Sequence, residues 1–91
     1  MNEESNSVGL SEKEALSNIN KVFSKTIKRI RKEKNLTQHD LEDGSGLSLR
    51  IVGDLETGER QPMLKTPFKL AKGLGLSFPE LIDEFVKDYY K

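Results

Sequence analysis

The sequence predicts an all-α protein whose five helices form a single domain over residues 11–91. Its apolar residues recur at spacings of three and four, which is the period of a helix with one buried face. A serine or threonine stands at the start of each of these segments, where helices favour such residues. No segment alternates convincingly between apolar and polar residues, as a half-buried strand does. A chain of 91 residues can bury a modest core in one domain.

The first helix is predicted to begin at a capping box. Ser11 and Glu14 form the Ser-x-x-Glu pattern that starts helices. The apolar residues that follow are spaced by three or four: Leu16, Ile19, Phe23, Ile27 and Ile30. One helix to about Lys34, or two helices joined near residues 18–20, both fit this pattern. Residues 1–10 are rich in Asn, Glu, Ser and Gly and predict a disordered tail.

Two short helices follow. Thr37 begins the second helix, and the segment Gly-Ser-Gly at residues 44–46 stops it after about two turns. Ser48 opens the third helix and Gly58 ends it. Two short helices joined by a tight turn pack at a steep angle, and Gly46 can take the positive φ that such a turn requires. This is helix-turn-helix geometry.

The fourth and fifth helices are each predicted from a capping residue and a proline. Thr66 before Pro67 predicts a fourth helix that starts at Thr66 and runs to Gly73 or Leu74. Ser77, with a proline two residues later, predicts the start of the fifth helix. The apolar side of the fifth helix consists of Leu81, Ile82, Phe85, Val86 and Tyr89.

The helix-turn-helix covers about residues 37–57. In this geometry four apolar residues face the core: Leu41, Leu47, Val52 and Leu55. Five residues are left on the outward face of the third helix: Leu49, Arg50, Gly53, Asp54 and Thr57. A helix with such a face can enter a DNA major groove. An ordinary helical hairpin is the alternative for this segment.

A longer series of residues stands in register over roughly residues 23–82. It consists of Leu36-Thr37-Gln38, Leu41, Gly46-Leu47-Ser48, Val52, Leu55-Glu56, Gly58, Pro62, Leu70-Ala71-Lys72, Leu74-Gly75-Leu76-Ser77 and Glu80-Leu81. In this series the chain resembles the lambda repressor and Cro-like helix-turn-helix regulators, also called xenobiotic-response-element type. Controller proteins of restriction-modification systems are small members that it looks like. The resemblance implies a compact five-helix, lambda-repressor-like DNA-binding domain, here with an N-terminal helical extension.

The resemblance also implies roles for individual residues. The recognition helix, about residues 48–57, presents four residues to the bases: Leu49, Arg50, Gly53 and Asp54. Phosphate contact or positioning is implied for Gln38, Ser48, Thr57 and Arg60. To these we add Lys28, which lies on a lysine-rich face of the first helix. Arg31 and Glu56 match a buried ion pair between the first and third helices.

Two positions depart from the family pattern. Glu42 stands where the family has alanine or another small residue, so we expect a looser crossing of the second and third helices. Pro67 falls inside what is normally the fourth helix, so we expect that helix to start late, at Thr66.

We expect a homodimer that binds double-stranded DNA at an inverted-repeat operator. The two recognition helices would meet half-sites about one turn, roughly 34 Å, apart. The subunit interface is assigned to the fifth helix, at Phe78, Leu81, Ile82, Phe85, Val86 and Tyr89, because its apolar surface exceeds what the core needs. Leu16 and Ile19 of the first helix could extend that interface.

Charge is segregated along the chain, although the formal net charge is zero. Residues 21–35 hold seven basic side chains and one acidic one, whereas residues 36–62 hold two basic and six acidic. An acidic motif weakens the sequence-independent attraction to phosphates. The alternative function is therefore a helix-turn-helix module that binds another protein, as an antitoxin or regulator-binding domain does, with weak or no DNA binding.

Several other classes are not expected. The chain has no cysteine, which excludes disulfides and thiolate metal sites, and His39 is its only histidine, so we expect no metal site and no cofactor. His39, Asp40 and Ser48 do not form a catalytic triad, since the first two point in different directions, and we expect no enzyme. There is no long apolar run and no signal peptide, so we expect a cytoplasmic protein without a membrane partner.

Overall fold

The computed structural model describes residues 11–91 and begins with the long helix α1 (Glu12–Glu33), which runs without interruption through residues 18–20. Of the two arrangements that the sequence allowed, the single helix is therefore correct. Both halves of the predicted capping box are present: Ser11 Oγ accepts the Glu14 N–H, and the Glu14 carboxylate accepts the Ser11 N–H. The predicted disordered tail, residues 1–10, lies outside the described residues.

The helix-turn-helix consists of α2 (Gln38–Ser45) and α3 (Leu49–Thr57). Thr37 caps α2 through a capping box, and the hydroxyl of Ser48 caps α3 by accepting the Ile51 N–H at 3.2 Å. Between the two helices, Gly46 has a φ of 77°, which a residue with a Cβ rarely adopts. The turn therefore depends on glycine at this position, as the sequence predicted.

Helix α4 (Lys65–Gly73) does not begin as predicted. Its N-cap is Leu64, in a helical conformation and without a side-chain cap, so Thr66 is the second helical residue and not the cap. A backbone bond from the Thr66 N–H to the Met63 carbonyl starts the turn in its place. Pro67 is accommodated in the first turn because no helical hydrogen bond is needed from its nitrogen there. Helix α5 (Phe78–Tyr89) starts after Ser77, as predicted.

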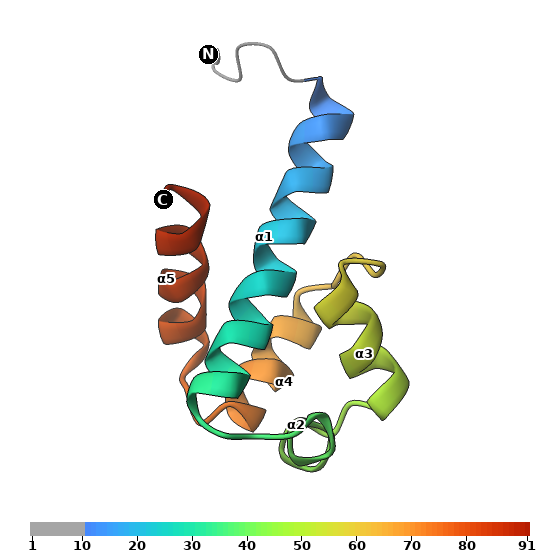
Figure 1. Ribbon diagram of the computed structural model, residues 1–91, viewed down its shortest axis with the longest axis vertical. Helices are drawn as coiled ribbons and strands as arrows, with labels where there is room; N and C mark the ends of the chain where they lie inside the picture. The colour runs from blue at the N-terminus through green and yellow to red at the C-terminus, as the bar shows by residue number, and fades with distance from the viewer. Residues whose placement is uncertain (1–10) are drawn as a thin grey trace.

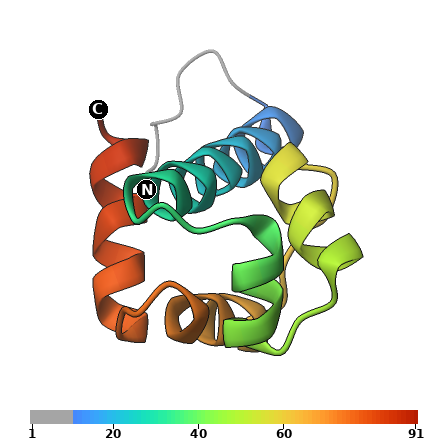
Figure 2. The ribbon, with the colours of Figure 1, turned by 60° about the horizontal axis from the view of Figure 1, so that its bottom comes forward.

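The five helices enclose one core, and α1 lies between α5 on one side and α3 on the other (Figures 1 and 2). The core consists of Phe23, Ile27, Ile30, Leu41, Leu47, Val52, Leu55, Leu70, Ala71, Leu74 and Leu81. All four residues predicted to face inward from the helix-turn-helix are among them. Helix α2 packs against α4, α3 packs against α1, and the two helices of the motif also pack against each other.

Polar contacts hold α5 against α1. Arg29 reaches Glu84 at 2.9 Å and Asp88 at 3.1 Å, and Thr26 Oγ1 donates to Asp88 at 2.7 Å. The hydrogen bond to Glu84 raises the pKa of Arg29, and the same bond lowers the pKa of Glu84. No helix within residues 11–91 is both long and apolar enough to cross a membrane.

Candidate nucleic-acid interface

Helix α3 presents one face to the core and one to solvent. Val52, Leu55 and Glu56 are buried. Of the five residues predicted on the outward face, Arg50 and Thr57 are exposed and the other three are partly exposed: Leu49, Gly53 and Asp54. The four predicted base-facing residues are thus all at least partly exposed. They lie on α3, which is at the edge of the molecule (Figure 1).

Neither Arg50 nor Gly53 is tied to a neighbouring part of the domain by the contacts within residues 11–91. Arg50 makes no ion pair with another residue of the described chain. A Cβ added to Gly53 would meet no atom within 4 Å, so packing inside the domain does not require a glycine there. Glycine in the middle of a helix lowers its stability, so its presence needs another reason.

Asp54 and Arg60 form an exposed ion pair. Arg60 Nη2 lies 3.5 Å from Asp54 Oδ2, and the two side chains are 37% exposed for Asp54 and 44% exposed for Arg60. A pair of this length and exposure contributes little to stability. Both groups are therefore able to leave each other for a partner at low cost. Sequence reasoning gave each of them a DNA contact and did not foresee that they meet.

The predicted pair of Arg31 and Glu56 is present and nearly buried. Arg31 Nε lies 2.6 Å from Glu56 Oε2, Nη2 lies 2.9 Å from Oε1, and the side chains are 11% and 3% exposed. Arg31 Nη1 also donates to the Leu36 carbonyl at 2.8 Å. The hydrogen bond to Glu56 raises the pKa of Arg31, because it favours the charged guanidinium. This pair joins the end of α1 to the end of α3.

Gln38 belongs to the same network. Its Nε2 donates to Glu56 Oε1 at 3.2 Å. This bond connects the start of α2 with the last turn of α3. The resemblance implied a phosphate contact or support for the start of the recognition helix, whereas this bond reaches the end of α3. The role of Gln38 toward DNA stays a prediction. Ser48 and Thr57 also bond within the domain: Ser48 caps α3, and Thr57 Oγ1 donates to the Asp54 carbonyl at 3.0 Å. Lys28 stands exposed on α1.

Glu42, at the position where a small residue was expected, makes a hydrogen bond across the turn of the motif. Its Oε2 accepts the N–H of Leu49, the first residue of α3, at 2.9 Å. The side chain that replaces a small residue therefore crosses the turn and caps the recognition helix from α2. A carboxylate at a helix N-terminus also interacts favourably with the helix dipole.

Most of the acidity of the motif is engaged inside the domain. Four of the six acidic residues in residues 36–62 have partners: Asp40 in the capping box of α2, Glu42 at the start of α3, Asp54 with Arg60, and Glu56 with Arg31. A count of charges along the chain treats these groups as free. The structure shows that they are mainly caps and pairs.

The apolar face of α5 differs from the predicted subunit interface at one residue, Leu81, and Phe85 belongs to both the core and the surface. Leu81 is fully buried in the core, so it is not available to a partner. Phe85 is partly buried, packs on the core and meets the Phe23 ring edge-on at 5.7 Å. Phe78, Ile82 and Tyr89 remain partly exposed and Val86 is 42% exposed.

Neighbouring residues enlarge the apolar face. Tyr90, which is 79% exposed and outside the prediction, and Ile19, which was expected to extend the interface, line a shallow groove with Phe85, Val86 and Tyr89. Beyond the other end of α5, the exposed Phe68 of α4 contacts Phe78, with ring centroids 6.1 Å apart. Tyr90 could have been included in the predicted interface because it directly follows Tyr89. The sequence did not mark Phe68, which lies on the exposed side of α4 together with Lys65, Lys69 and Lys72.

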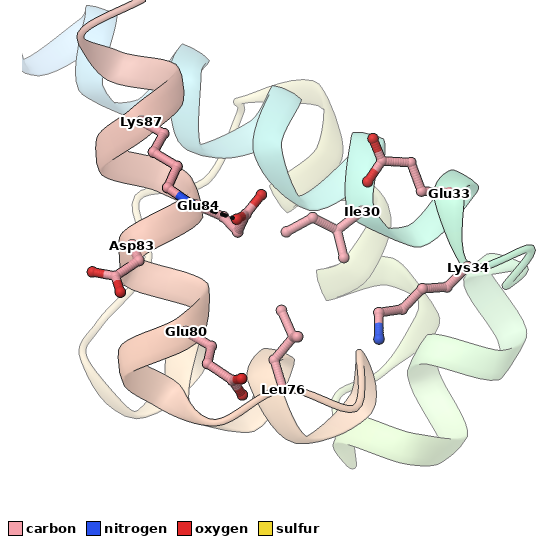
Figure 3. Close-up of a pocket in the computed structure, with 8 residues that line it drawn as sticks. All are labelled: Ile30, Glu33, Lys34, Leu76, Glu80, Asp83, Glu84 and Lys87. Atoms are coloured by element: carbon pink, nitrogen blue, oxygen red, sulfur yellow. Dashed lines mark ion pairs between the residues drawn. The ribbon is translucent and has the colours of Figure 1, made fainter.

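A separate cavity opens between the C-terminal end of α1 and α5 (Figure 3). Ile30 and Leu76 line it together with four acidic residues and two lysines: Glu33, Glu80, Asp83, Glu84, Lys34 and Lys87. It contains no residue of the helix-turn-helix. Within residues 11–91 no group of histidine, cysteine and acidic side chains has the arrangement of a metal site.

Comparisons with known proteins agree with this geometry. A family model described as helix-turn-helix matches residues 27–81. The chain is 40% identical over 62 residues to an uncharacterised HTH-type transcriptional regulator, y4dJ, of Sinorhizobium fredii, and the match covers 68% of this chain and 80% of that protein. It is 34% identical over 64 residues to the control protein C.SmaI of Serratia marcescens, covering 70% and 76% of the two chains.

Solved structures give the same result. The chain superposes on the restriction-modification controller protein C.Esp1396I, in a crystal structure of its tetramer with a natural 35-base-pair operator. The TM-score is 0.76 at 30% identity, and the match covers 80% of this chain and 96% of that one. The similarity therefore extends over nearly the whole of a protein solved on DNA.

Proposed function

The chain belongs to the helix-turn-helix family, and from this premise we propose that it is a transcriptional regulator that binds double-stranded operator DNA as a homodimer. The observation that carries the proposal is the outward face of α3, with an exposed Arg50 that makes no ion pair within residues 11–91. Operator DNA as the partner implies that it works in the cytoplasm. The repressors and control proteins among its relatives support the same class of function.

In the proposed complex α3 lies in the major groove. Four side chains or backbone positions face the bases: Leu49, Arg50, Gly53 and Asp54. A second set contacts phosphates or holds the helices in place: Gln38, Ser48, Thr57, Arg60 and Lys28. The network of Arg31, Gln38 and Glu56 fixes α3 against α1 and α2. The bases are then read by a helix whose orientation is set before DNA arrives.

The proposal is tested by selecting bound fragments from random-sequence DNA and measuring their affinity at several salt concentrations. Phosphate contacts predict a linear fall of log K with log salt, and base contacts predict that selected sequences share an inverted repeat. Binding without salt dependence, or no selected sequence, contradicts the proposal. The protein-interaction module is then favoured, and the observation that supports it is the excess of acidic residues in the motif.

Dimerisation is proposed to use the exposed apolar face of α5. Its central exposed residue is Val86, flanked by Ile82 and Tyr89, with Ile19 and Tyr90 beside it. A two-fold axis through α5 places both copies of α3 away from the axis, because α1 separates α5 from α3 (Figure 1). Such an arrangement suits two half-sites of an inverted repeat.

Replacing Val86 with glutamate is expected to weaken self-association by at least about tenfold, because the dimer would bury an unpaired charge. Val86 is 42% exposed in the single chain, so the monomer should remain folded. Equilibrium sedimentation measures the change, and Lys87→Gln, on the other side of the helix beside Glu84, is the control. A wild-type protein that stays monomeric at high micromolar concentration contradicts the assigned interface.

Replacing Gly53 with alanine is expected to have opposite effects on the free protein and on the complex. The free domain should gain up to about 1 kcal/mol, because alanine favours a helix and the added Cβ meets no atom within 4 Å. Operator affinity should fall, because the methyl group holds α3 away from the bases. Thermal melts and operator titrations measure the two effects. An operator affinity equal to that of the wild type removes Gly53 from the base-facing set.

A further inference from the structure

The solvent side of α1 carries a line of four lysines, which we call the lysine stripe: Lys21, Lys25, Lys28 and Lys32. Their spacings of three and four place them on one face of the helix. All four are exposed, and none makes an ion pair within residues 11–91. From its first to its last residue the stripe runs roughly 16 Å along the helix axis.

The other sides of α1 are already occupied. Phe23 points into the core, Arg29 reaches α5 and Arg31 reaches α3. The acidic groups next to the stripe on α1 are also engaged, since Glu33 pairs with Arg29 and the Glu14 carboxylate accepts a backbone N–H in its capping box. The four ammonium groups are thus a positive surface that the domain itself does not neutralise.

The stripe borders the end of the recognition helix. Ser24 lies three residues after Lys21 and four before Lys28, so it occupies the same region of the α1 surface. A Cβ added to Gly58, the C-cap of α3, would lie 3.3 Å from Ser24 Oγ. The C-terminal end of α3 therefore packs against α1 at Ser24, a buried residue one helical turn from two lysines of the stripe. Thr57, the last residue of the outward face of α3, directly precedes this contact, so the stripe lies beside the C-terminal end of that face.

We propose that the lysine stripe is a second DNA-binding surface, which contacts the phosphate backbone at the rim of the major groove that α3 enters. This inference rests on the proposed function. It assigns the sequence-independent part of DNA binding to these four lysines. Phosphates suit the stripe because an ammonium group is a strongly hydrated point charge that needs no fixed geometry. Residues 36–62 supply only Arg50 and Arg60, so most non-specific affinity has to come from cations outside this segment.

The test is a triple variant in which Lys21, Lys25 and Lys32 become glutamine while Lys28 is kept. Affinity is measured on the selected operator and on a random duplex of equal length over a range of salt. The slope of log K against log salt should fall by about 0.9 for each phosphate that the variant no longer neutralises. Affinity should decrease by similar factors on both duplexes, so the preference for the operator is retained.

A matched control removes three exposed lysines, one in α4, one in α5 and one after α5: Lys72→Gln, Lys87→Gln and Lys91→Gln. It changes the net charge equally, and its slope should stay at the wild-type value. The same three stripe positions changed to arginine should also keep the wild-type slope. If the salt slope falls in the glutamine variant but not in the control or the arginine variant, the result supports phosphate contact by the lysine stripe.

Two results overturn the inference, and they are distinguishable from each other. If the glutamine variant and the control have the same slope, the stripe makes no contact, while the proposed function stands. If the wild-type protein itself binds DNA without salt dependence, the proposed function fails and the stripe fails with it. Circular dichroism of each variant checks that the exposed substitutions leave the helices intact.

Discussion

Replacing Glu56 with alanine should destabilise the domain by about 3 kcal/mol, because it leaves the Arg31 guanidinium nearly buried without its counter-charge. Two hydrogen bonds of 2.6 and 2.9 Å are removed, and Gln38 is left without its acceptor as well. Urea unfolding followed by circular dichroism measures the change. Operator affinity should also fall, since the ends of α1 and α3 are no longer joined.

Two companion variants separate the buried pair from a general charge effect. Glu59→Ala removes an exposed acidic residue three positions away and should change stability by less than about 0.5 kcal/mol. Changing Arg31 and Glu56 together to methionine removes both charges and should restore much of the stability, because apolar residues of similar volume often replace a buried pair without cost. If Glu56→Ala unfolds at the wild-type urea concentration, the pair adds nothing to stability.

The helix starts show how far the sequence alone defines this fold. Thr37, Ser48 and Ser77 cap helices where the pattern predicted, because a capping hydroxyl and the N–H groups it accepts lie within one turn of each other. Thr66 is the exception. A cap can also be formed by the backbone, and the Thr66 N–H bonds to the Met63 carbonyl, so the helix begins earlier than predicted.

Side chains that act between helices were less predictable. The pattern marked Glu42 as an oversized residue at a helix crossing, yet its carboxylate reaches the first N–H of α3. Leu81 was assigned to the subunit interface because it lies on the apolar side of α5. That side faces the core at some residues and solvent at others, and Leu81 faces the core. A helical period identifies an apolar face and does not divide it between core and partner.

Electrostatics was the property that the sequence described least well. The acidic excess of residues 36–62 argued against a DNA-binding motif. The fold engages most of those carboxylates through short-range partners that come from other helices or from the helix ends, such as Arg31 for Glu56 and the Leu49 N–H for Glu42. The lysines of the stripe lie on α1, which α2 separates from α3 in the sequence. In the fold, α1 contacts the C-terminal end of α3.

Arg50 is expected to carry the largest share of operator preference. It is exposed on the outward face of α3, two residues after the cap Ser48, and its side chain is free of ion pairs within the described chain. A guanidinium can donate two parallel hydrogen bonds to O6 and N7 of a guanine. Each such contact contributes about 1–3 kcal/mol of discrimination, and a dimer makes the contact in both half-sites.

Replacing Arg50 with alanine should therefore weaken operator binding by about 2–6 kcal/mol, summed over the two half-sites, and random DNA should be affected far less. Repeated selection with the variant should show relaxed preference at one base pair of each half-site. Arg60→Ala is the matched control from the loop after α3. It should weaken binding to operator and random DNA by similar factors, with a lower salt slope.

The comparison of these two arginines decides between a base contact and a phosphate contact for Arg50. Arg60 is held 3.5 Å from Asp54 and lies in the loop after α3, where the DNA backbone passes in the proposed complex. Arg50 lies on the helix that enters the groove, and no other side chain of α3 is a cation. If Arg50→Ala weakens operator and random DNA equally, Arg50 touches phosphate, and base preference then rests on Leu49, Gly53 and Asp54. If it reduces only the operator affinity, the guanine contact is established, and the identity of the relaxed base pair fixes the register of α3 on the DNA.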